Sequence, residues 1–452
     1  MIRLPLFHPK KPPTFPLSKG LYRFPAAEQQ YQLTLHLRVE SAEQSSLIIN
    51  GNTILLLNPT ATLMTYLTLQ NTTYKETIKQ LSKCFAVSNT TLEQDYRNFS
   101  INLRSILERG HPCFQEDIEI ETLFPFKHQP TAPYRMDLAL TYQCNNDCFH
   151  CYNDPERKIQ SMSQEQWKRT IDRLWDLGIP HIVFTGGEPT LYENLIPLIE
   201  YAKQKGLIIG LNTNGRRLSK ADYAKSLSTA GLDHVQITLE SAHPTVHDSI
   251  VRTKGAWKQT VAGITNALNT DLFVMTNTTL LRENANTLSD TLSFLESLGV
   301  PTVGLNALIY SGRGCSVSSP LSENELFSIL QIAQDFTAES GQRLIWYTPT
   351  HYCNFDPMSL NLGIKGCTAA LYNMCIEPNG NVLPCQSYYQ SLGNILLDTW
   401  ESIWNHPLAL ALRNRKYVAE HCENCLLIHQ CGGGCPLAPM DTSQLSFSRI
   451  EA

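Results

Sequence analysis

Three cysteines lie within eight residues of the chain and could together bind a metal centre. They are Cys144, Cys148 and Cys151, and they directly follow the apolar run MDLALTY. Thiolates are soft ligands that bind zinc or the irons of iron-sulfur clusters. Three of them can hold three irons of a cubane 4Fe-4S cluster and leave the fourth iron open to an exchangeable ligand. An open metal position is where a reaction can take place. The alternative is a zinc site in which a histidine such as His150 or His181 supplies the fourth ligand.

A second group of polar residues, Thr185-Gly186-Gly187-Glu188-Pro189, ends the next apolar run. Two successive glycines let a ligand approach the backbone closely, and the Glu188 carboxylate can accept a hydrogen bond from an ammonium group. Polar groups also end the later apolar runs: Asn212-Thr213-Asn214-Gly215, Glu240-Ser241, Asn277 and Gly312-Arg313-Gly314.

Six apolar runs alternate with amphipathic helical segments over residues 135–345. Near-continuous apolar strands separated by helices require parallel pairing with the helices outside, and right-handed crossovers wind such units into a barrel. We therefore predict an α/β fold with a partial (β/α)6 TIM barrel. In such folds the active site lies at the carboxyl ends of the strands. The polar groups described above fall at those ends.

Spacing, order and strand context together make this segment resemble the radical S-adenosylmethionine (SAM) enzymes. The resemblance rests on Cys-x3-Cys-x2-Cys after the first strand and Gly-Gly-Glu-Pro after the second. It implies a 4Fe-4S cluster whose fourth iron is chelated by the amino and carboxylate groups of SAM. It also implies that Gly186, Gly187 and Glu188 receive the methionine amino end. Asn214 and Ser241 are the matching candidates for ribose or carboxylate contacts, or for strand-end turn chemistry in the case of Asn214. The segment ITLES departs from the commoner Ser-Leu-Asp form.

Eight further cysteines crowd the residues that follow the predicted barrel, within the segment 346–452. The pattern, with Gly-Asn-Ile and Cys-x2-Cys-x5-Cys-x3-Cys, resembles the SPASM extension of radical SAM enzymes. The resemblance implies two auxiliary 4Fe-4S clusters, although a zinc ribbon would use similar pairs. One cluster would use Cys367, Cys385 and Cys435 with Cys375, and the other would use Cys422, Cys425 and Cys431. The family usually has one more cysteine downstream of Cys435, which this sequence lacks. We expect Cys353 to complete the second set, or else an open iron there binds substrate.

Residues 30–112 precede the barrel and are predicted to form a winged-helix-like α+β module of three short strands followed by three helices. The module resembles the PqqD-like peptide-recognition element, in which a leader peptide adds as a strand to the sheet edge. A structural or dimerising winged helix with no peptide partner is the alternative. Residues 1–29 are expected to be an N-terminal extension, and the proline-containing residues 113–134 are expected to be a linker.

Composition and charge argue against several classes of partner. The net charge is -5 over 452 residues, with 36 basic and 41 acidic side chains and no polybasic run. This argues against nucleic acid or an anionic membrane as the main partner. The sequence also shows no signal-peptide core and no apolar run of about 18 residues. We therefore expect a cytoplasmic location, where the 14 cysteines suit metal ligands better than disulfides.

The leading hypothesis is a radical SAM enzyme that modifies a ribosomally made precursor peptide by cross-linking, epimerisation or excision. An electron donor such as flavodoxin or ferredoxin would be its reductase partner. Cys315, just after the sixth strand, is a candidate catalytic hydrogen donor or else a spare packed cysteine. Alternatives are a radical SAM enzyme that acts on a tetrapyrrole or on a folded protein in the manner of sulfatase maturation, and a non-catalytic electron-transfer or scaffold protein.

Overall fold

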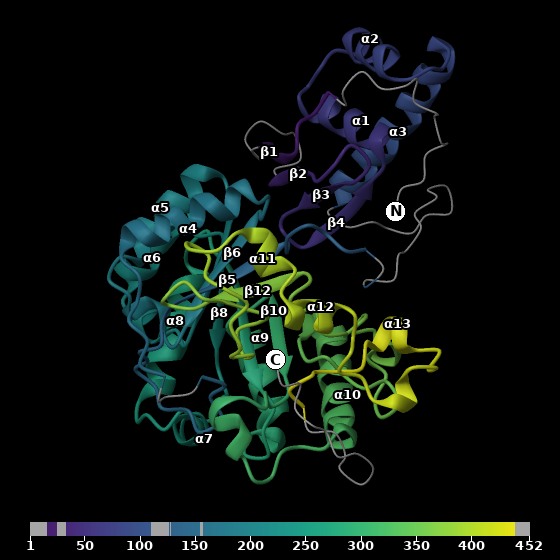
Figure 1. The fold of residues 1–452 in the computed structure, drawn as a ribbon. Helices are drawn as coiled ribbons and strands as arrows, with labels where there is room; N and C mark the ends of the chain where they lie inside the picture. The colour runs from purple at the N-terminus through teal and green to yellow at the C-terminus, as the bar shows by residue number, and fades with distance from the viewer. Residues whose placement is uncertain (1–15, 25–32, 110–125, 127, 154–156, 439–452) are drawn as a thin grey trace. The chain divides into compact units, whose positions relative to one another are not determined.

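The structure is a computed structural model that describes residues 16–24, 33–109, 126, 128–153 and 157–438. The chain divides into two compact units (Figure 1). The first contains Met1–Tyr134 and Asp172–Pro180, and the second contains Arg135–Ile171 and His181–Ala452. No helix in the described ranges is long and apolar enough to cross a membrane. The domain boundaries expected from the sequence stay a prediction.

The first unit contains a four-stranded antiparallel sheet followed by three helices. The sheet has the order β1-β2-β3-β4, and its inner face packs with the helices into one apolar core. The strands are β1 (Gly20–Phe24), β2 (Leu35–Val39), β3 (Ser45–Ile49) and β4 (Thr53–Leu57), and the helices are α1 (Pro59–Leu69), α2 (Tyr74–Cys84) and α3 (Asn89–Arg109).

Strand β1 was not expected from the sequence, which predicted three strands. It has only five residues and falls in the proline-interrupted stretch assigned to the N-terminal extension. Its place is set by contacts made after folding: it pairs antiparallel with β2, Phe24 is 3% exposed, and the ring of Tyr22 lies 5.4 Å from that of Tyr66 on α1. Such long-range pairing leaves little signal in a short segment.

His128 makes the first unit sensitive to acid. Burial, and secondarily the charge of Arg38, lowers the pKa of His128 to about 4. Its ring contacts Gln44 Nε2 at 3.5 Å and the Tyr134 hydroxyl at 3.1 Å. The unfolded chain takes up a proton below about pH 6.5, whereas the folded unit does not do so until about pH 4. Stability is therefore lost as the pH falls through this window.

We expect the unit to lose about 1–2 kcal/mol between pH 7 and pH 5, a value reduced for the partial exposure of the ring. Urea unfolding of the full chain, followed by hydrogen exchange of peptides from β2 to β4, measures it. His128→Gln should lower stability at pH 7 but flatten the pH dependence. An unchanged pH dependence in the variant would contradict the assignment.

The second unit is built on an open nine-stranded sheet in which the six predicted barrel strands are consecutive and parallel. The order is β11-β10-β9-β8-β7-β6-β5-β12-β13. This confirms the predicted α/β barrel fold. The barrel strands are β5 (Arg135–Thr141), β6 (His181–Gly186), β7 (Ile208–Thr213), β8 (His234–Thr238), β9 (Phe273–Thr279) and β10 (Thr302–Asn306).

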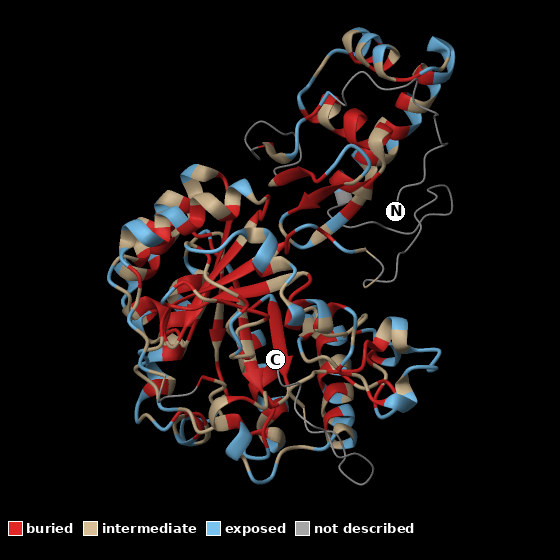
Figure 2. Cartoon of the chain, viewed as in Figure 1, coloured by how far each residue is buried: buried red, intermediate tan, exposed pale blue. Residues whose placement is uncertain are grey.

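Helices cover the sheet on its outer side, and the strands form the buried centre of the unit (Figure 2). Several helices end at a glycine. For example, Gly206 adopts the left-handed conformation (φ 100°) at the end of α5. The helices are α4 (Gln164–Asp176), which belongs to this unit up to Ile171, α5 (Leu195–Lys205), α6 (Ala221–Thr229), α7 (Pro244–Ile250), α8 (Ala256–Leu268), α9 (Leu288–Ser297) and α10 (Glu323–Ser340).

Two additions extend the barrel sheet at its edges. Strand β11 (Arg343–Trp346) pairs parallel with β10. On the other edge, β12 (Asn373–Ile376) and β13 (Val382–Leu383) form the hairpin that the Pro-Asn-Gly turn predicts, and β12 pairs parallel with β5. The sequence did not predict this docking, which places the cysteine-rich tail beside the strand that precedes Cys144. The rest of the tail contains the short helices α11 (Trp400–Trp404), α12 (Pro407–Arg413) and α13 (Ile428–Cys431).

Candidate functional site

The loop of residues 144–151, hereafter the cluster loop, follows the carboxyl end of β5 and carries the three clustered thiols. Burial is the main reason that the pKa of each thiol is raised, that of Cys144 to about 11. The charges of Cys151 and Cys144 raise the pKa of Cys148 further, so the three thiols act on one another. Deprotonating such thiols requires a positive partner, and an iron-sulfur cluster supplies one. The donor set therefore fits a cluster.

The Gly-Gly segment lies against the start of the cluster loop. Gly187 N donates to Thr141 O at 2.7 Å, and Glu188 N donates to Gln143 O at 2.8 Å. A Cβ atom on Gly186, which has φ 131°, would lie 2.2 Å from Thr141 O. One on Gly187 would lie 2.4 Å from Gln143 O. The two glycines are thus required for the backbone of β6 to meet the cluster loop.

Glu188 is 1% exposed and joins the ends of two strands. Its Oε1 accepts from Thr190 N, Thr190 Oγ1 and Thr213 Oγ1 at 3.1, 2.6 and 2.7 Å, and its Oε2 accepts from Asn214 N at 2.8 Å. Burial raises the pKa of Glu188, and these hydrogen bonds oppose that rise. Oε2 accepts one hydrogen bond and retains a lone pair for an ammonium group. Binding of the methionine amino end by Gly186, Gly187 and Glu188 stays a prediction.

Of the two other predicted SAM contacts, Asn214 reaches the cluster loop. Its Nδ2 lies 2.6 Å from Asn145 Oδ1 and 4.0 Å from Cys144 Sγ. Ser241 is buried, and its hydroxyl contacts Thr287 Oγ1 at 3.0 Å and accepts from His243 N at 3.1 Å. Both roles as SAM contacts stay predictions.

Arg252 is a candidate residue for binding a carboxylate of a ligand, and the sequence interpretation missed it. It follows α7, and the end of α7 binds the cluster loop: Asp147 N donates to Val251 O at 3.0 Å, and Phe149 N donates to Ile250 O at 3.2 Å. The Arg252 guanidinium lies 5.9 Å from the centre of the Phe149 ring. A guanidinium beside the cluster loop suits a carboxylate, because its N–H groups match two carboxylate oxygens. The signal in the sequence was only a basic residue after a short helix.

Cys315 lies in the turn Gly312–Ser316 after β10 and is exposed. The same turn touches the cluster loop, since Arg313 N donates to Cys151 O at 2.9 Å. Proximity along the chain therefore places Cys315 near this loop. Its role as a hydrogen donor stays a prediction.

The tail cysteines act on one another in two groups. The pKa of Cys367 is raised first by burial and then by the charges of Cys435 and Cys385, and the pKa of Cys375 is raised by burial, Asp137 and Cys385. These four, Cys367, Cys375, Cys385 and Cys435, are called the first tail set. The sequence interpretation assigned these four cysteines to one auxiliary cluster, and that assignment stays a prediction.

Cys353 acts together with the other three tail cysteines. Burial raises the pKa of Cys353, and the charge of Cys431 and, more weakly, that of Cys425 raise it further. Burial raises the pKa of Cys422, and among the neighbouring charges that raise it further that of Cys353 has the largest effect. The Cys431 thiol accepts from Tyr352 N at 3.4 Å and contacts Thr350 O at 3.4 Å. These contacts draw Cys431 to the segment that carries Cys353, and the four are called the second tail set.

Cys353→Ala is expected to lower the iron content of the reconstituted protein, because a cluster that loses one of four thiolates is bound less tightly. Iron and acid-labile sulfide should fall by up to about four atoms per chain. Cys315→Ala, which removes another exposed thiol, should leave the iron content unchanged. Equal iron in Cys353→Ala and the parent would favour the open-iron alternative.

Within the described residues, no group of three or more His, Cys, Asp or Glu side chains converges closely enough to hold one metal ion. A zinc site and an iron-sulfur cluster differ in their ligands, since zinc takes four ligands at one centre and each thiolate of a cluster binds a different iron.

Two family models match the chain. Residues 138–295 match the radical SAM superfamily, and residues 367–426 match SPASM, an iron-sulfur cluster-binding domain. The first matched range contains the cluster loop and the Gly-Gly-Glu-Pro segment. The second contains five of the eight tail cysteines, namely Cys367, Cys375, Cys385, Cys422 and Cys425, whereas Cys353, Cys431 and Cys435 lie outside it.

Curated relatives include peptide-processing and haem-pathway proteins. The chain is 28% identical over 326 residues to the antilisterial bacteriocin subtilosin biosynthesis protein AlbA of Bacillus subtilis, covering 70% of each chain. It is 27% identical over 328 residues to Fe-coproporphyrin III synthase of Methanosarcina barkeri, covering 65% of this chain and 81% of that one.

A solved structure shares the fold of most of the chain. Streptococcus suis SuiB bound to S-adenosylmethionine matches with a TM-score of 0.64 and 16% identity, covering 89% of this chain and 94% of SuiB. SuiB has also been solved bound to the precursor peptide SuiA, with the same TM-score and coverage. At this level of identity the match supports the fold.

Proposed function

Because the chain is a radical SAM enzyme that carries a SPASM domain, we propose that it modifies a ribosomally made precursor peptide. The relatives support this proposal, since they include the subtilosin biosynthesis protein AlbA and the mycofactocin maturase MftC, to which the chain is 28% identical in each case. The proposal does not specify which bond of the peptide is made or broken.

When bound, SAM and the 4Fe-4S cluster would supply the difficult chemistry, which is reductive cleavage of SAM and removal of a hydrogen atom from an unactivated carbon. The chain's own residues hold and enclose these groups. Cys144, Cys148 and Cys151 would hold the cluster, and the Gly186-Gly187 backbone fixes the strand end beside it. The two tail sets would hold the auxiliary clusters.

The observation that carries the peptide proposal is the open-edged sheet of the N-terminal module. In the described residues, β1 pairs only with β2, and β4 pairs only with β3. An outer strand has unpaired N–H and C=O groups on one side, so an extended peptide can add to it through main-chain hydrogen bonds. We infer that the leader of the precursor binds in this way, as the PqqD-like interpretation predicts for residues 30–112.

The test uses the peptide encoded by a short open reading frame beside the gene, incubated anaerobically with the enzyme, SAM and dithionite. Mass spectrometry of the peptide and chromatography of 5'-deoxyadenosine measure modification and SAM cleavage separately. A core peptide without its leader should be modified about 100-fold more slowly, because tethering by the leader raises its effective concentration. Deletion of residues 1–112 should cause the same loss and leave peptide-independent SAM cleavage in place.

Two results would contradict the proposal in different ways. If deletion of residues 1–112 left modification of the full peptide unchanged, the leader-binding role would be wrong. If the full-length enzyme cleaved SAM but modified no peptide, the substrate class would be wrong.

A tetrapyrrole is the second candidate substrate, and the similarity to Fe-coproporphyrin III synthase favours it. Incubation of the enzyme with iron coproporphyrin III under the same conditions distinguishes the two. Turnover of the porphyrin without turnover of the peptide would support this candidate and would also leave the N-terminal module without a leader to bind.

We further infer a small reductase as a partner, because reductive cleavage needs one electron from outside the chain. Flavodoxin and ferredoxin are the candidates that the sequence interpretation named. The assay tests each candidate when reduced flavodoxin or reduced ferredoxin replaces dithionite as the electron donor. The cytoplasmic location stays a prediction.

A further inference from the structure

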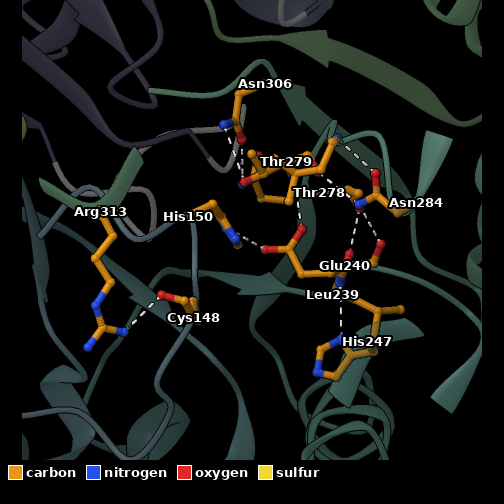
Figure 3. Close-up of polar contacts among 12 residues, drawn as sticks. Cys148, His150, Leu239, Glu240, His247, Thr278, Thr279, Asn284, Asn306 and Arg313 are labelled. Carbon is orange, nitrogen blue, oxygen red and sulfur yellow. Dashed lines mark hydrogen bonds and ion pairs between the residues drawn. The ribbon is translucent and has the colours of Figure 1, made fainter. Parts of the chain in front are cut away.

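The cluster loop lies between a guanidinium and a carboxylate that come from two other loops of the barrel. Figure 3 shows Arg313 directed toward the backbone at Cys148, and Glu240 directed toward His150. Neither side chain is a ligand of the predicted cluster. Both carry a formal charge, and the two charges have opposite signs.

Arg313 is fixed on the cluster loop by several contacts. Its Nη1 donates to Asp147 O at 3.0 Å and Cys148 O at 3.1 Å, and it pairs with Asp147 Oδ1 at 2.6 Å. Its backbone N donates to Cys151 O at 2.9 Å. The turn can come this close because Gly312, with φ 53°, has no side chain: a Cβ there would lie 2.5 Å from Tyr152 O. The guanidinium is therefore held in one place.

Glu240 is held on another side of the same loop and is 1% exposed. Its Oε1 lies 3.2 Å from His150 Nε2, and its Oε2 accepts from Thr279 N at 2.9 Å. The backbone is fixed as well, since Glu240 N donates to His247 Nδ1 at 3.1 Å and Glu240 O accepts from Asn284 Nδ2 at 2.8 Å. This buried carboxylate cannot turn away from the loop without losing these contacts.

The two side chains place formal charges of opposite sign beside the cluster loop, since the Arg313 guanidinium contacts the carbonyl oxygens of Asp147 and Cys148 and the Glu240 carboxylate contacts His150. A positive neighbour favours negative charge on this loop, and a buried negative neighbour opposes it.

Reduction of an iron-sulfur cluster adds one negative charge to the same place. Nearby charges and hydrogen bonds are among the features that set cluster potentials. A fixed positive charge favours the reduced form, and a buried negative charge favours the oxidised form. Solvent screens the effect of Arg313, whose side chain is 27% exposed, more than that of Glu240.

We propose that Arg313 and Glu240 set the reduction potential of the cluster on this loop in opposite directions, Arg313 raising it and Glu240 lowering it. They act through their charges and are positioning residues, not ligands. The proposal rests on the radical SAM assignment and is independent of whether the substrate is a peptide.

The test is a potentiometric titration of the reconstituted full-length protein followed by electron paramagnetic resonance. A variant with all three loop cysteines replaced by alanine gives the background signal of the tail. Arg313→Gln should reduce the ratio of reduced to oxidised cluster at a fixed potential by about threefold to tenfold. That change corresponds to a potential lower by about 30–60 mV, since tenfold is about 59 mV for one electron. Glu240→Gln should raise the potential by at least as much.

Three further variants separate charge from structure. Arg313→Lys keeps the charge and should keep the potential near that of the parent. Asp147→Asn removes the anion paired with Arg313 and should raise the potential. Arg282→Gln removes an arginine of the loop after β9 that pairs with Glu325 on α10 and should have no effect.

The proposal is wrong if Arg313→Gln and Arg313→Lys shift the potential equally, or if Glu240→Gln lowers it. If Arg313→Gln or Glu240→Gln fails to take up iron, the result with Asp147→Asn decides: a raised potential supports the proposal, and an unchanged or lowered one overturns it. Iron content, measured on every variant, shows which case applies.

Discussion

Replacement of Cys148 by alanine is expected to abolish reductive cleavage of SAM while leaving the iron of the tail in place. Cys148 is the middle thiol of the cluster loop, and two thiolates cannot hold three irons of the cluster. Iron should fall by about four atoms per chain, whereas the rest should remain because the tail sets have their own thiols. Iron analysis and 5'-deoxyadenosine formation with dithionite measure the two effects.

Cys84→Ala is the matched control for this prediction. Cys84 ends α2 in the N-terminal module, where it packs against the apolar core. Its loss should leave both iron content and SAM cleavage unchanged. Retention of SAM cleavage in Cys148→Ala would contradict the assignment of the cluster loop, and loss of all iron would mean that the tail does not bind clusters independently.

Replacement of Gly187 by alanine is expected to be almost as damaging, although it adds only a methyl group. The new Cβ would lie 2.4 Å from Gln143 O and 2.6 Å from Tyr142 O. These are backbone atoms just before Cys144, so the cluster loop must move. Such overpacking costs about 1–3 kcal/mol. A displacement of about 1 Å at a reacting centre can reduce the rate about 100-fold.

The control for this prediction is Gly299→Ala. Gly299 follows α9 and, unlike Gly187, has a left-handed conformation with φ 80°, but a Cβ there would meet nothing within 4 Å. It should cost stability through backbone strain and leave the rate of SAM cleavage unchanged. If Gly187→Ala and Gly299→Ala lowered the rate equally, the effect would be one of general stability and the close approach to the cluster loop would not matter.

The alternating barrel strands and the loop that carries Cys144, Cys148 and Cys151 could be predicted from the sequence. Strand-forming runs are local signals, and ligands that lie three and four residues apart are brought together by a short loop alone. The Gly-Gly-Glu-Pro segment could be placed beside that loop because neighbouring parallel strands end at the same edge of the sheet.

The tertiary structure decided which distant residues surround that loop. Arg313 lies 166 residues from Asp147, whose carbonyl it binds, and nothing in the local sequence marks this pairing. Glu188 is another example: the sequence shows an acidic side chain after two glycines, but only the fold shows that its carboxylate binds Thr190, Thr213 and Asn214. These contacts depend on strand order.

The sequence alone determined the chemistry of this protein, because residue types and short spacings define a cluster-binding loop and a cysteine-rich tail. Only the tertiary structure decided how the distant parts act together. It placed β12 beside β5, and it brought Arg313 and Glu240 to the cluster loop. The physical reason is that ligand spacing within a loop is fixed by the covalent chain, whereas contacts between distant segments depend on packing and strand pairing that no single segment encodes.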